Sequence, residues 1–303
     1  MKSLFRSFLI LFLLGALCDL SSCTKAKYDD NYTKGAVPPI GSYNNSNDVA
    51  ASNLLAHWTF DSTYNESISQ TAPSNSVGAS FIQGVKGKAL HLSAGYLLYP
   101  AISALNTANA VNSCTVSMWI NVDNNGSQAS EFFALTPEAA KQTDWGSVIN
   151  VYAETGHPVS TDDTLALHSA VGNYASGSRA SGDNINDYGT REVDFKTVHG
   201  TNKWVHYVMV YDGSASTLDI YANSILVSNN NFRVRTGLGP LVAPVPVQVL
   251  IGGWPNAATG FPLSGAQSWQ ALLTGSIDEI RVYNKALSAF DIHALYFFEK
   301  LGN

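Results

Sequence analysis

The sequence predicts an all-β protein, a two-sheet antiparallel jelly-roll sandwich with one short C-terminal helix. Short apolar or alternating segments recur from residue 54 to residue 283, and turn residues separate them. Charged residues make up only 13% of the chain, against about 25% in ordinary soluble domains. Ser, Thr, Asn and Gly supply most of the polar character, which is typical of a β-protein with many turns.

The first half of the pattern contains four strand candidates, at residues 54–61, 87–92, 96–99 and 114–122. The last is the clearest, because apolar side chains occupy every second position from Cys114 to Val122. Cys114 is therefore expected to be a small core residue and not a reactive thiol.

The second half contains strand candidates at 204–211, 217–222 and 247–253. Residues 204–211 are apolar on both faces, which is expected of a strand that is covered on both sides. Asn223 and Ser224 occupy the turn after residue 222. Ser at the second position would strain a type I′ turn there, because both central residues need a positive φ.

The closing segment, residues 275–288, reads as a strand followed by a helix start. Ile280 and Val282 fall on one face of the strand, and Glu279 and Arg281 on the other. Ser288 is a good helix N-cap, since Asp291 three residues later completes a variant of the capping box. Leu287 and Ile292 have the spacing of a hydrophobic staple.

The order and spacing of these segments resemble the laminin-G-like, concanavalin A-like lectin–glucanase superfamily, over residues 54–298. The resemblance implies a two-sheet sandwich. It does not decide the function, because this sandwich carries lectins, hydrolases and adhesion modules.

The N-terminal residues 1–22 read as a signal peptide, with Lys2 and Arg6 before an apolar run at 8–17. Residues 20–23 resemble a bacterial lipobox, which would make Cys23 the lipidated residue; an ordinary secretory signal is the alternative. Residues 23–52 are expected to form a flexible tether and 53–303 the jelly-roll domain. Residues 27–30 resemble a Bacteroidetes-type surface-sorting signal. We therefore expect an outer-membrane lipoprotein exposed at the cell surface.

No catalytic or nucleic-acid-binding motif is found. The chain has a net charge of −6 and no basic run, so a nucleic-acid partner is not expected. Hydrolases of this fold use a Glu-x-Asp-x-(x)-Glu strand with carboxylates about 5 Å apart, and no such run occurs. Asp278 and Glu279 are adjacent, so a regular strand points them to opposite faces. His57, His91 and His206 lie within strand candidates and are expected to be structural.

Residues 136–196 exceed the minimal pattern of the family and are rich in Gly, Ser, Asn and Asp. Short strand candidates lie at 147–153 and 164–169, and extended loops are expected elsewhere. Long loops on a rigid sandwich commonly carry recognition residues; an elaborated surface without a ligand is the alternative. Four acids of this region, Asp183, Asp187, Glu192 and Asp194, are expected to be solvated.

Exposed aromatic faces are what a carbohydrate site needs, because the C–H faces of sugars stack on them. The candidate ligand-binding residues in loops or beside strands are Trp145, Tyr174, Tyr188, Arg191, Trp254 and Trp269. Arg179 and Arg191 are candidates to pair with an acidic sugar or with local Asp residues. Burial of the aromatics in a small loop core is the alternative.

The resemblance also implies a structural Ca²⁺, with Asp61 and Asp278 as the matching ligands. The leading hypothesis is a non-catalytic, surface-anchored glycan-binding lipoprotein that captures polysaccharide, with protein partners in a glycan-uptake system. The rivals are a protein-binding adhesin or interaction module and a divergent glycosidase or lyase.

Overall fold

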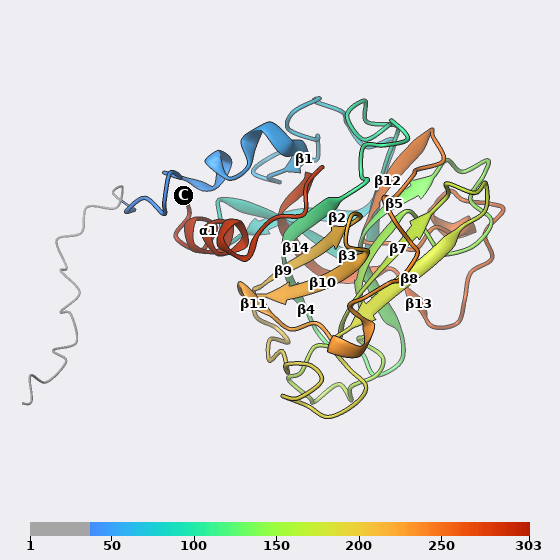
Figure 1. The fold of residues 1–303 in the computed structure, drawn as a ribbon. Helices are drawn as coiled ribbons and strands as arrows, with labels where there is room; N and C mark the ends of the chain where they lie inside the picture. The colour runs from blue at the N-terminus through green and yellow to red at the C-terminus, as the bar shows by residue number, and fades with distance from the viewer. Residues whose placement is uncertain (1–36) are drawn as a thin grey trace, which may run out of the picture. The chain divides into compact units, whose positions relative to one another are not determined.

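The computed structural model describes residues 37–303, which form a two-layer β-sandwich (Figure 1). The first layer holds β1 (Leu54–Trp58), β4 (Cys114–Val122), β9 (Val205–Asp212), β10 (Thr217–Ala222), β11 (Ile225–Leu226) and β14 (Leu273–Tyr283). The second holds β5 (Ala129–Pro137), β6 (Ile149–Ala153), β7 (Leu167–Asn173), β8 (Ala180–Ile185), β12 (Val247–Ile251) and β13 (Gln270–Ala271).

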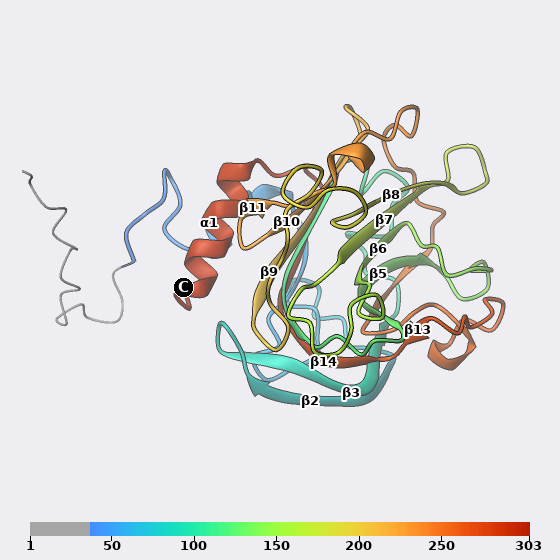
Figure 2. The same ribbon diagram turned by 90° about the horizontal axis from the view of Figure 1, so that it is seen from below.

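One long strand joins the layers. β3 (Lys88–Tyr99) pairs with β14 near its start and with β12 at its end, and forms a hairpin with β2 (Asn75–Gln83). The strand order is β11-β10-β9-β4-β14-β3-β12-β5-β6-β7-β8. All these pairings are antiparallel, and β13 alone pairs in parallel, with β5. Figure 2 shows the sheet curling so that its two halves face each other. This confirms the predicted jelly-roll sandwich.

The core lies between the two layers, where the inward side chains of both halves meet. Val116 and Ile120 of β4 are fully buried there with Leu135 of β5, Val151 of β6 and Ile251 of β12. In the second layer these inward positions alternate with positions on the opposite, outer face of the sheet. That outer face carries the candidate site.

Several sequence predictions are confirmed in detail. β4 has the predicted bounds, and Cys114 is buried in the core. Tyr207 of β9 faces the core, whereas Val208 packs in a second apolar cluster on the other side, so this strand is covered on both faces. Asn223 and Ser224 both have positive φ, 49° and 66°, as the turn between β10 and β11 requires. Ser224 therefore adopts a backbone conformation that serine rarely takes.

The prediction of extended loops over residues 136–196 is wrong in part. β6 and β7 lie where strands were expected, but β8 was not predicted, and together with β5 they form four of the six strands of the second layer. Polar side chains on the outer face obscured the pattern, because an alternation with Gly, Ser, Asp and Asn looks like a loop in sequence.

The C-terminal helix α1 (Ala289–Lys300) begins at the predicted cap. The Asp291 backbone N–H donates to Ser288 Oγ at 3.2 Å, and the Ser288 N–H donates to the Asp291 carboxylate at 3.2 Å. Leu287 and Ile292 are buried in the same apolar cluster beside β9. No helix among residues 37–303 is long and apolar enough to cross a membrane.

The segment before β1 is packed against α1, although its composition predicted a flexible tether. It contains two 3₁₀ turns, η1 (Ser46–Asp48) and η2 (Ala51–Asn53). Val49 is 1% exposed within the α1 cluster, and the Tyr43 hydroxyl donates to the Asp291 carboxylate at 2.8 Å. The tether prediction is therefore wrong for residues 37–52; residues 1–36, including Cys23 and the predicted signal peptide, lie outside the described part.

This packing has a measurable consequence for stability. Val49→Ala should lower the free energy of unfolding by about 1–2 kcal/mol, because it removes two buried methyl groups and leaves a small cavity. The matched control is Val234→Ala, since Val234 is 61% exposed. Denaturant unfolding measures both; equal, negligible effects would mean that the segment is a free tether.

A buried charged cluster lies between β14 and α1. Arg281 donates from Nη2 to Glu279 at 2.6 Å and from Nε to Glu299 at 2.8 Å, and all three side chains are fully buried. Arg281 Nη1 also donates to Asn47 Oδ1 at 3.0 Å. Trp119 Nε1 donates to the second oxygen of Glu299 at 2.8 Å. The cluster joins the first layer, α1 and the N-terminal segment.

Candidate functional site

A pocket of about 610 Å³ opens on the outer face of β6, β7 and β8. Strand register builds its floor. Tyr152 of β6 lies opposite His168 of β7, and Ala170 of β7 lies opposite Asp183 of β8. Because partners across an antiparallel pair project to the same face, these side chains form one continuous surface away from the core.

Two tryptophans from two loops form the wall of this pocket, and a third supports them from below. Trp145 precedes β6 and Trp269 precedes β13, and both line the pocket while half-buried. Their ring centroids are 5.4 Å apart in an edge-to-face arrangement. Trp254 packs beneath both, 4.8 Å from Trp269, and donates from Nε1 to the Ala129 carbonyl oxygen. Edge-to-face contacts of this kind favour one fixed arrangement of the rings.

The polar part of the pocket centres on His168. Its Nδ1 is 2.9 Å from a Glu154 oxygen, and its Nε2 is 3.2 Å from an Asp183 oxygen. The other Asp183 oxygen is 3.3 Å from Arg235. The imidazole also lies 4.3 Å, centroid to centroid, from the Tyr152 ring. Two carboxylates thus fix the ring orientation of one histidine within an aromatic-lined pocket.

This arrangement shifts the pKa values of its members. Burial lowers the pKa of His168, but the bonds and charges of Asp183 and Glu154 outweigh burial, so the net shift is upward. The bond to His168 lowers the pKa of Asp183. We therefore expect His168 to hold its proton more strongly than a free histidine does.

A pH-dependent stability difference should follow. The raised pKa of His168 stabilises the folded protein fully below pH 6.5, the ordinary pKa that the histidine has in the unfolded chain. This stabilisation is lost as the pH rises through the pKa of His168 in the folded protein. The lowered pKa of Asp183 stabilises the folded protein above pH 3.8, its ordinary pKa in the unfolded chain. This stabilisation is lost as the pH falls through the pKa of Asp183 in the folded protein. His168→Gln should therefore cost roughly 1 kcal/mol of unfolding free energy near pH 5–6 and less at pH 8.

Thermal unfolding from pH 4 to pH 9 measures this difference. The matched control is His199→Gln, which removes an ion pair with Asp163 at 2.8 Å whose two side chains are mostly exposed. An exposed pair of this kind contributes little. A His168→Gln penalty that is independent of pH would contradict the assigned role of the protonated ring.

Glu131 and Asn150 support the tryptophan wall from below. Glu131 of β5 pairs in register with Tyr152 and is fully buried. Asn150 donates to Glu131 at 3.2 Å and accepts from the Ser147 N–H at 2.8 Å, which holds the loop that carries Trp145. Burial raises the pKa of Glu131 well above its usual range. A protonated Glu131 avoids the cost of a buried charge.

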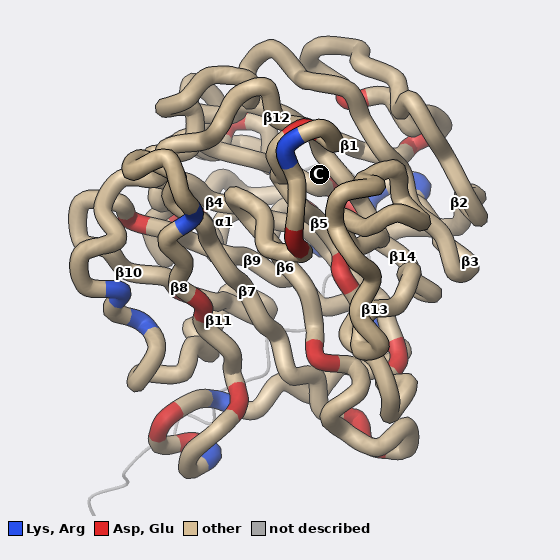
Figure 3. Tube along the Cα trace, turned by 90° about the vertical axis from the view of Figure 1, so that its right-hand side faces the viewer, with Lys and Arg blue, Asp and Glu red and all other residues tan. Residues whose placement is uncertain are grey.

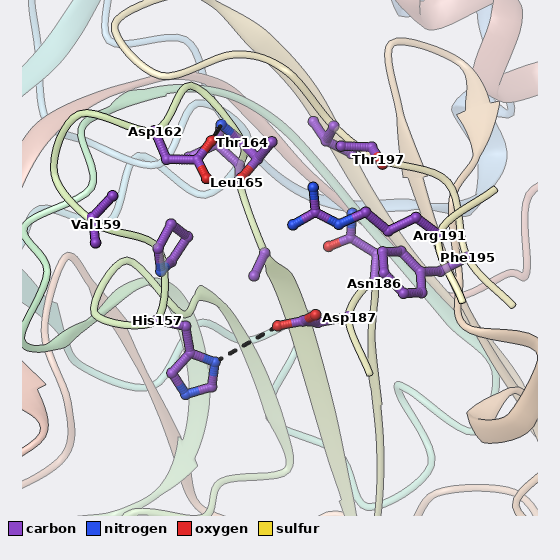
Figure 4. Close-up of a pocket in the computed structure, with 13 residues that line it drawn as sticks. His157, Val159, Asp162, Thr164, Leu165, Asn186, Asp187, Arg191, Phe195 and Thr197 are labelled. Carbon is purple, nitrogen blue, oxygen red and sulfur yellow. Dashed lines mark hydrogen bonds and ion pairs between the residues drawn. The ribbon is translucent and has the colours of Figure 1, made fainter. Parts of the chain in front are cut away.

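A smaller pocket of about 260 Å³ lies next to the first and is shown in Figure 4. It is lined by Asp162, Asn186, Arg191 and Phe195, and His157 lines both pockets. The dashed line in Figure 4 joins His157 to Asp187, 3.9 Å apart. The shared histidine makes the two hollows adjacent parts of one surface.

The structure separates the aromatic residues predicted to bind ligand. Trp145 and Trp269 share the larger pocket, as described above. Trp254 is only 1% exposed, so the prediction that it contacts ligand is wrong and its role is to support the other two. Tyr174 is half-buried, and its hydroxyl lies 3.4 Å from the Gly146 carbonyl oxygen. Tyr188 is exposed, and its ring centroid lies 6.3 Å from that of His157. Neither tyrosine lines either of the two pockets described above.

The predicted calcium ligands lie elsewhere, beside the β2–β3 turn. One Asp278 oxygen accepts from the Val85 and Lys86 N–H groups, and the other accepts from the Glu279 N–H. An Asp61 oxygen accepts from the Lys88 N–H at 2.9 Å. Burial raises the pKa of Asp278 to about 8, against the effect of these bonds. N–H donors thus contact both Asp278 oxygens and one Asp61 oxygen, and a calcium site at this pair stays a prediction.

Metal-binding geometry is not found within residues 37–303, where no three His, Cys, Asp or Glu side chains are placed to share an ion. His57 instead contacts Glu279 at 2.9 Å, and His206 contacts Ser117 at 2.8 Å. His91 lies 3.0 Å from Ser276. These three histidines have the structural partners that their positions within strands predicted.

Tyr152, Glu154 and His168 were not among the residues predicted to bind ligand, although the sequence pattern contains a signal for two of them. Residues 147–153 and 164–169 were predicted as strands, and alternation within them places Tyr152 and His168 opposite the core-facing positions. Their cross-strand pairing was not predictable, because register depends on the turn between β6 and β7. Asp183 was noted as a solvated loop acid, but it belongs to β8 and contacts His168.

The charges around the site are dispersed. Figure 3 shows the side of the molecule that carries β5–β8 and β13, where Lys and Arg positions do not gather into one patch. This side therefore offers no concentrated positive patch that would attract an anionic ligand from a distance. Recognition at the pocket would therefore depend on short-range contacts.

No family model and no curated protein matches the chain. Among solved structures, the binding domain of Paraclostridial mosquitocidal protein 1 is similar, with a TM-score of 0.50, 14% identity and coverage of 81% of this chain and 52% of that one. The binding domain of botulinum neurotoxin DC, in complex with SialylT, has a TM-score of 0.51, 12% identity and coverage of 84% and 52%.

A third similar structure is domain 4 of AbnA, a GH43 extracellular arabinanase from Geobacillus stearothermophilus, in complex with arabinotriose. It has a TM-score of 0.49, 18% identity and coverage of 80% of this chain and 98% of that one. The chain spans about half the length of the two toxin chains. At these identities the toxin domains support the class of fold, a lectin-like β-sandwich, and not a particular function.

Proposed function

We propose that this protein is a non-catalytic glycan-binding protein whose site is the pocket on the outer face of β6, β7 and β8. The observation that carries the proposal is the combination of two half-buried tryptophans, Trp145 and Trp269, with a polar floor around His168. Apolar ring faces with a few fixed polar groups are what ligand pockets use for affinity and orientation. A sugar ring can place its C–H face against the tryptophan rings and direct its hydroxyls at the polar groups around His168.

The rigidity of the site favours recognition of a preformed ligand. Trp254 and Asn150 hold the tryptophan wall from below, and Glu154 and Asp183 fix the histidine from two sides. Side chains that are already ordered lose little conformational entropy when a ligand binds. The pocket of about 610 Å³ also has room for a few sugar rings at most, with the rest of a longer chain outside it.

The cellular role in this proposal is polysaccharide capture at the cell surface. The predicted lipobox, with Cys23 as the lipidated residue, would hold the domain at the outer membrane. Residues 23–36 would then link the packed unit, which begins at Val37, to the membrane. Other proteins of a glycan-uptake system would receive the captured polysaccharide.

Glycoside hydrolysis is the second candidate, and one observation favours it: Glu154 and Asp183 are two carboxylates in one pocket. Against it, both bind the same imidazole, and the pKa of Asp183 is lowered. A general acid in glycoside hydrolysis needs a raised pKa. Release of reducing sugar from a bound polysaccharide, abolished by Glu154→Gln, would establish the hydrolase instead.

The test of the proposal is a tryptophan substitution at the pocket. Trp269→Ala should weaken binding of the retained polysaccharide by about tenfold to a hundredfold, which corresponds to ~1.4–2.8 kcal/mol. Affinity gel electrophoresis of the full chain through a panel of neutral and acidic polysaccharides measures it. Phe290→Ala is the control, because Phe290 is an exposed aromatic on α1. Equal retardation of both variants and the wild type would reject this pocket as the site.

A further inference from the structure

The side chain of Arg179 lies against the tryptophan wall of the pocket in a space made by two glycines. Its guanidinium carbon is 5.8 Å from the centroid of Trp145, and Nε donates to the Ser147 carbonyl oxygen at 3.2 Å. A Cβ on Gly146 would meet the guanidinium carbon at 2.4 Å, and one on Gly172 would meet Nε at 2.6 Å. Any larger residue at either position would displace the arginine, so the backbone is shaped around it.

Arg179 has no acidic partner among residues 37–303. Its hydrogen bond goes to a backbone carbonyl, and Nη2 is buried without any hydrogen-bond acceptor. Asp144 is the acid of the neighbouring loop, but its carboxylate accepts from the Gly146 N–H and forms no ion pair with Arg179. A buried guanidinium nitrogen without an acceptor is costly, because it has lost its water and gained no partner.

The other charges of the pocket are already paired. Glu154 contacts His168 at 2.9 Å and His157 at 3.6 Å. Asp183 contacts His168 at 3.2 Å and Arg235 at 3.3 Å. Both acids therefore have basic side chains as partners, whereas Arg179 lines the pocket without an acidic partner among residues 37–303.

We propose that Arg179 selects an acidic glycan, whose carboxylate or sulfate group binds the guanidinium while a sugar ring of the same ligand lies against Trp145 or Trp269. Because Nε donates to Ser147 and Nη2 is buried, Nη1 is the nitrogen left to donate a charge-assisted hydrogen bond to an oxygen of a carboxylate or a sulfate. The surrounding rings exclude water and so strengthen this charged contact. The inference rests on the proposed function and names its ligand class.

The experiment compares matched polysaccharides. Uronic-acid polymers are tested beside their carboxyl-reduced forms, and sulfated polymers beside their desulfated forms, by affinity gel electrophoresis of the full chain. Wild-type protein should bind at least one acidic member tenfold or more tightly than its neutral counterpart. The two kinds of pair separate a carboxylate from a sulfate as the anionic group.

Two variants test Arg179 itself. Arg179→Gln should abolish the preference, so that the acidic and the neutral member bind with equal affinity, and Arg179→Lys should restore the preference only in part. The control is Arg233→Gln, which removes the same charge from an ion pair with Asp219 outside the pocket. It should keep the preference.

The outcomes separate this inference from the proposed function. Equal wild-type binding of acidic and neutral members, lost in Trp269→Ala, overturns the role of Arg179 and keeps the glycan site. An acidic preference that survives Arg179→Gln also overturns the inference. Retention by no polysaccharide in the panel overturns both the inference and the proposed function.

Discussion

Arg281→Met should lower the free energy of unfolding by about 3–5 kcal/mol at pH 8. Arg281 is fully buried between Glu279 and Glu299, at 2.6 and 2.8 Å. Without the guanidinium, two buried carboxylates face each other with no arginine between them. The pKa of Glu299 is already raised to about 7 by burial, so the penalty should shrink below pH 6 as this group takes up a proton.

Denaturant unfolding at pH 5.5 and pH 8 measures the effect. The control is a triple variant, Arg281→Met with Glu279→Gln and Glu299→Gln, which removes the stranded charges and should recover most of the lost stability. If Arg281→Met alone left the free energy of unfolding unchanged at pH 8, the cluster would not hold α1 and residues 46–47 against β14 as the structure indicates.

Trp254→Ala should lower the free energy of unfolding by about 3–5 kcal/mol and also weaken glycan binding. Trp254 is buried beneath Trp145 and Trp269 at centroid distances of 5.9 and 4.8 Å. The cavity left by the indole would let both rings tilt away from the pocket. Binding should therefore fall although Trp254 itself does not reach the ligand.

Phe261→Ala is the matched control for Trp254→Ala. Phe261 is also a fully buried aromatic residue, but it packs in a separate apolar cluster with Leu98 and Leu250. Its loss should cost similar stability while glycan affinity stays unchanged, measured well below the unfolding temperature. Equal losses of affinity in the two variants would mean that stability in general, and not the tryptophan wall, controls binding.

The sequence predicted the first layer of this fold better than the second. Strands with strict apolar alternation, such as residues 114–122, and the capped helix after Ser288 appear where they were expected. Alternation and capping are local signals, so one segment contains all the information. β8 and β13 were not predicted, because their outward positions are polar and their burial depends on partners far away in the sequence.

The same distinction explains the candidate site. Residue type pointed to Trp145 and Trp269, but nothing local separated them from Trp254, which the fold buries. The contact of Glu154 and Asp183 with one histidine depends on the register of three strands, which sequence alone does not fix. The packing of segment 37–53 was not predicted for a related reason. A few apolar residues such as Val49 are enough to hold the segment in place when α1 offers a complementary surface.

Hydrogen–deuterium exchange of the full chain, with and without the most strongly retained polysaccharide, tests whether the glycan occupies the outer-face pocket. We expect slower exchange on ligand binding in β6, β7 and β8 and in the loops that carry Trp145 and Trp269, with no change in α1 or in the β2–β3 hairpin. Protection confined to the β2–β3 turn beside Asp61 and Asp278, or to α1, would place the ligand elsewhere and contradict the assignment of the outer-face pocket as the glycan site.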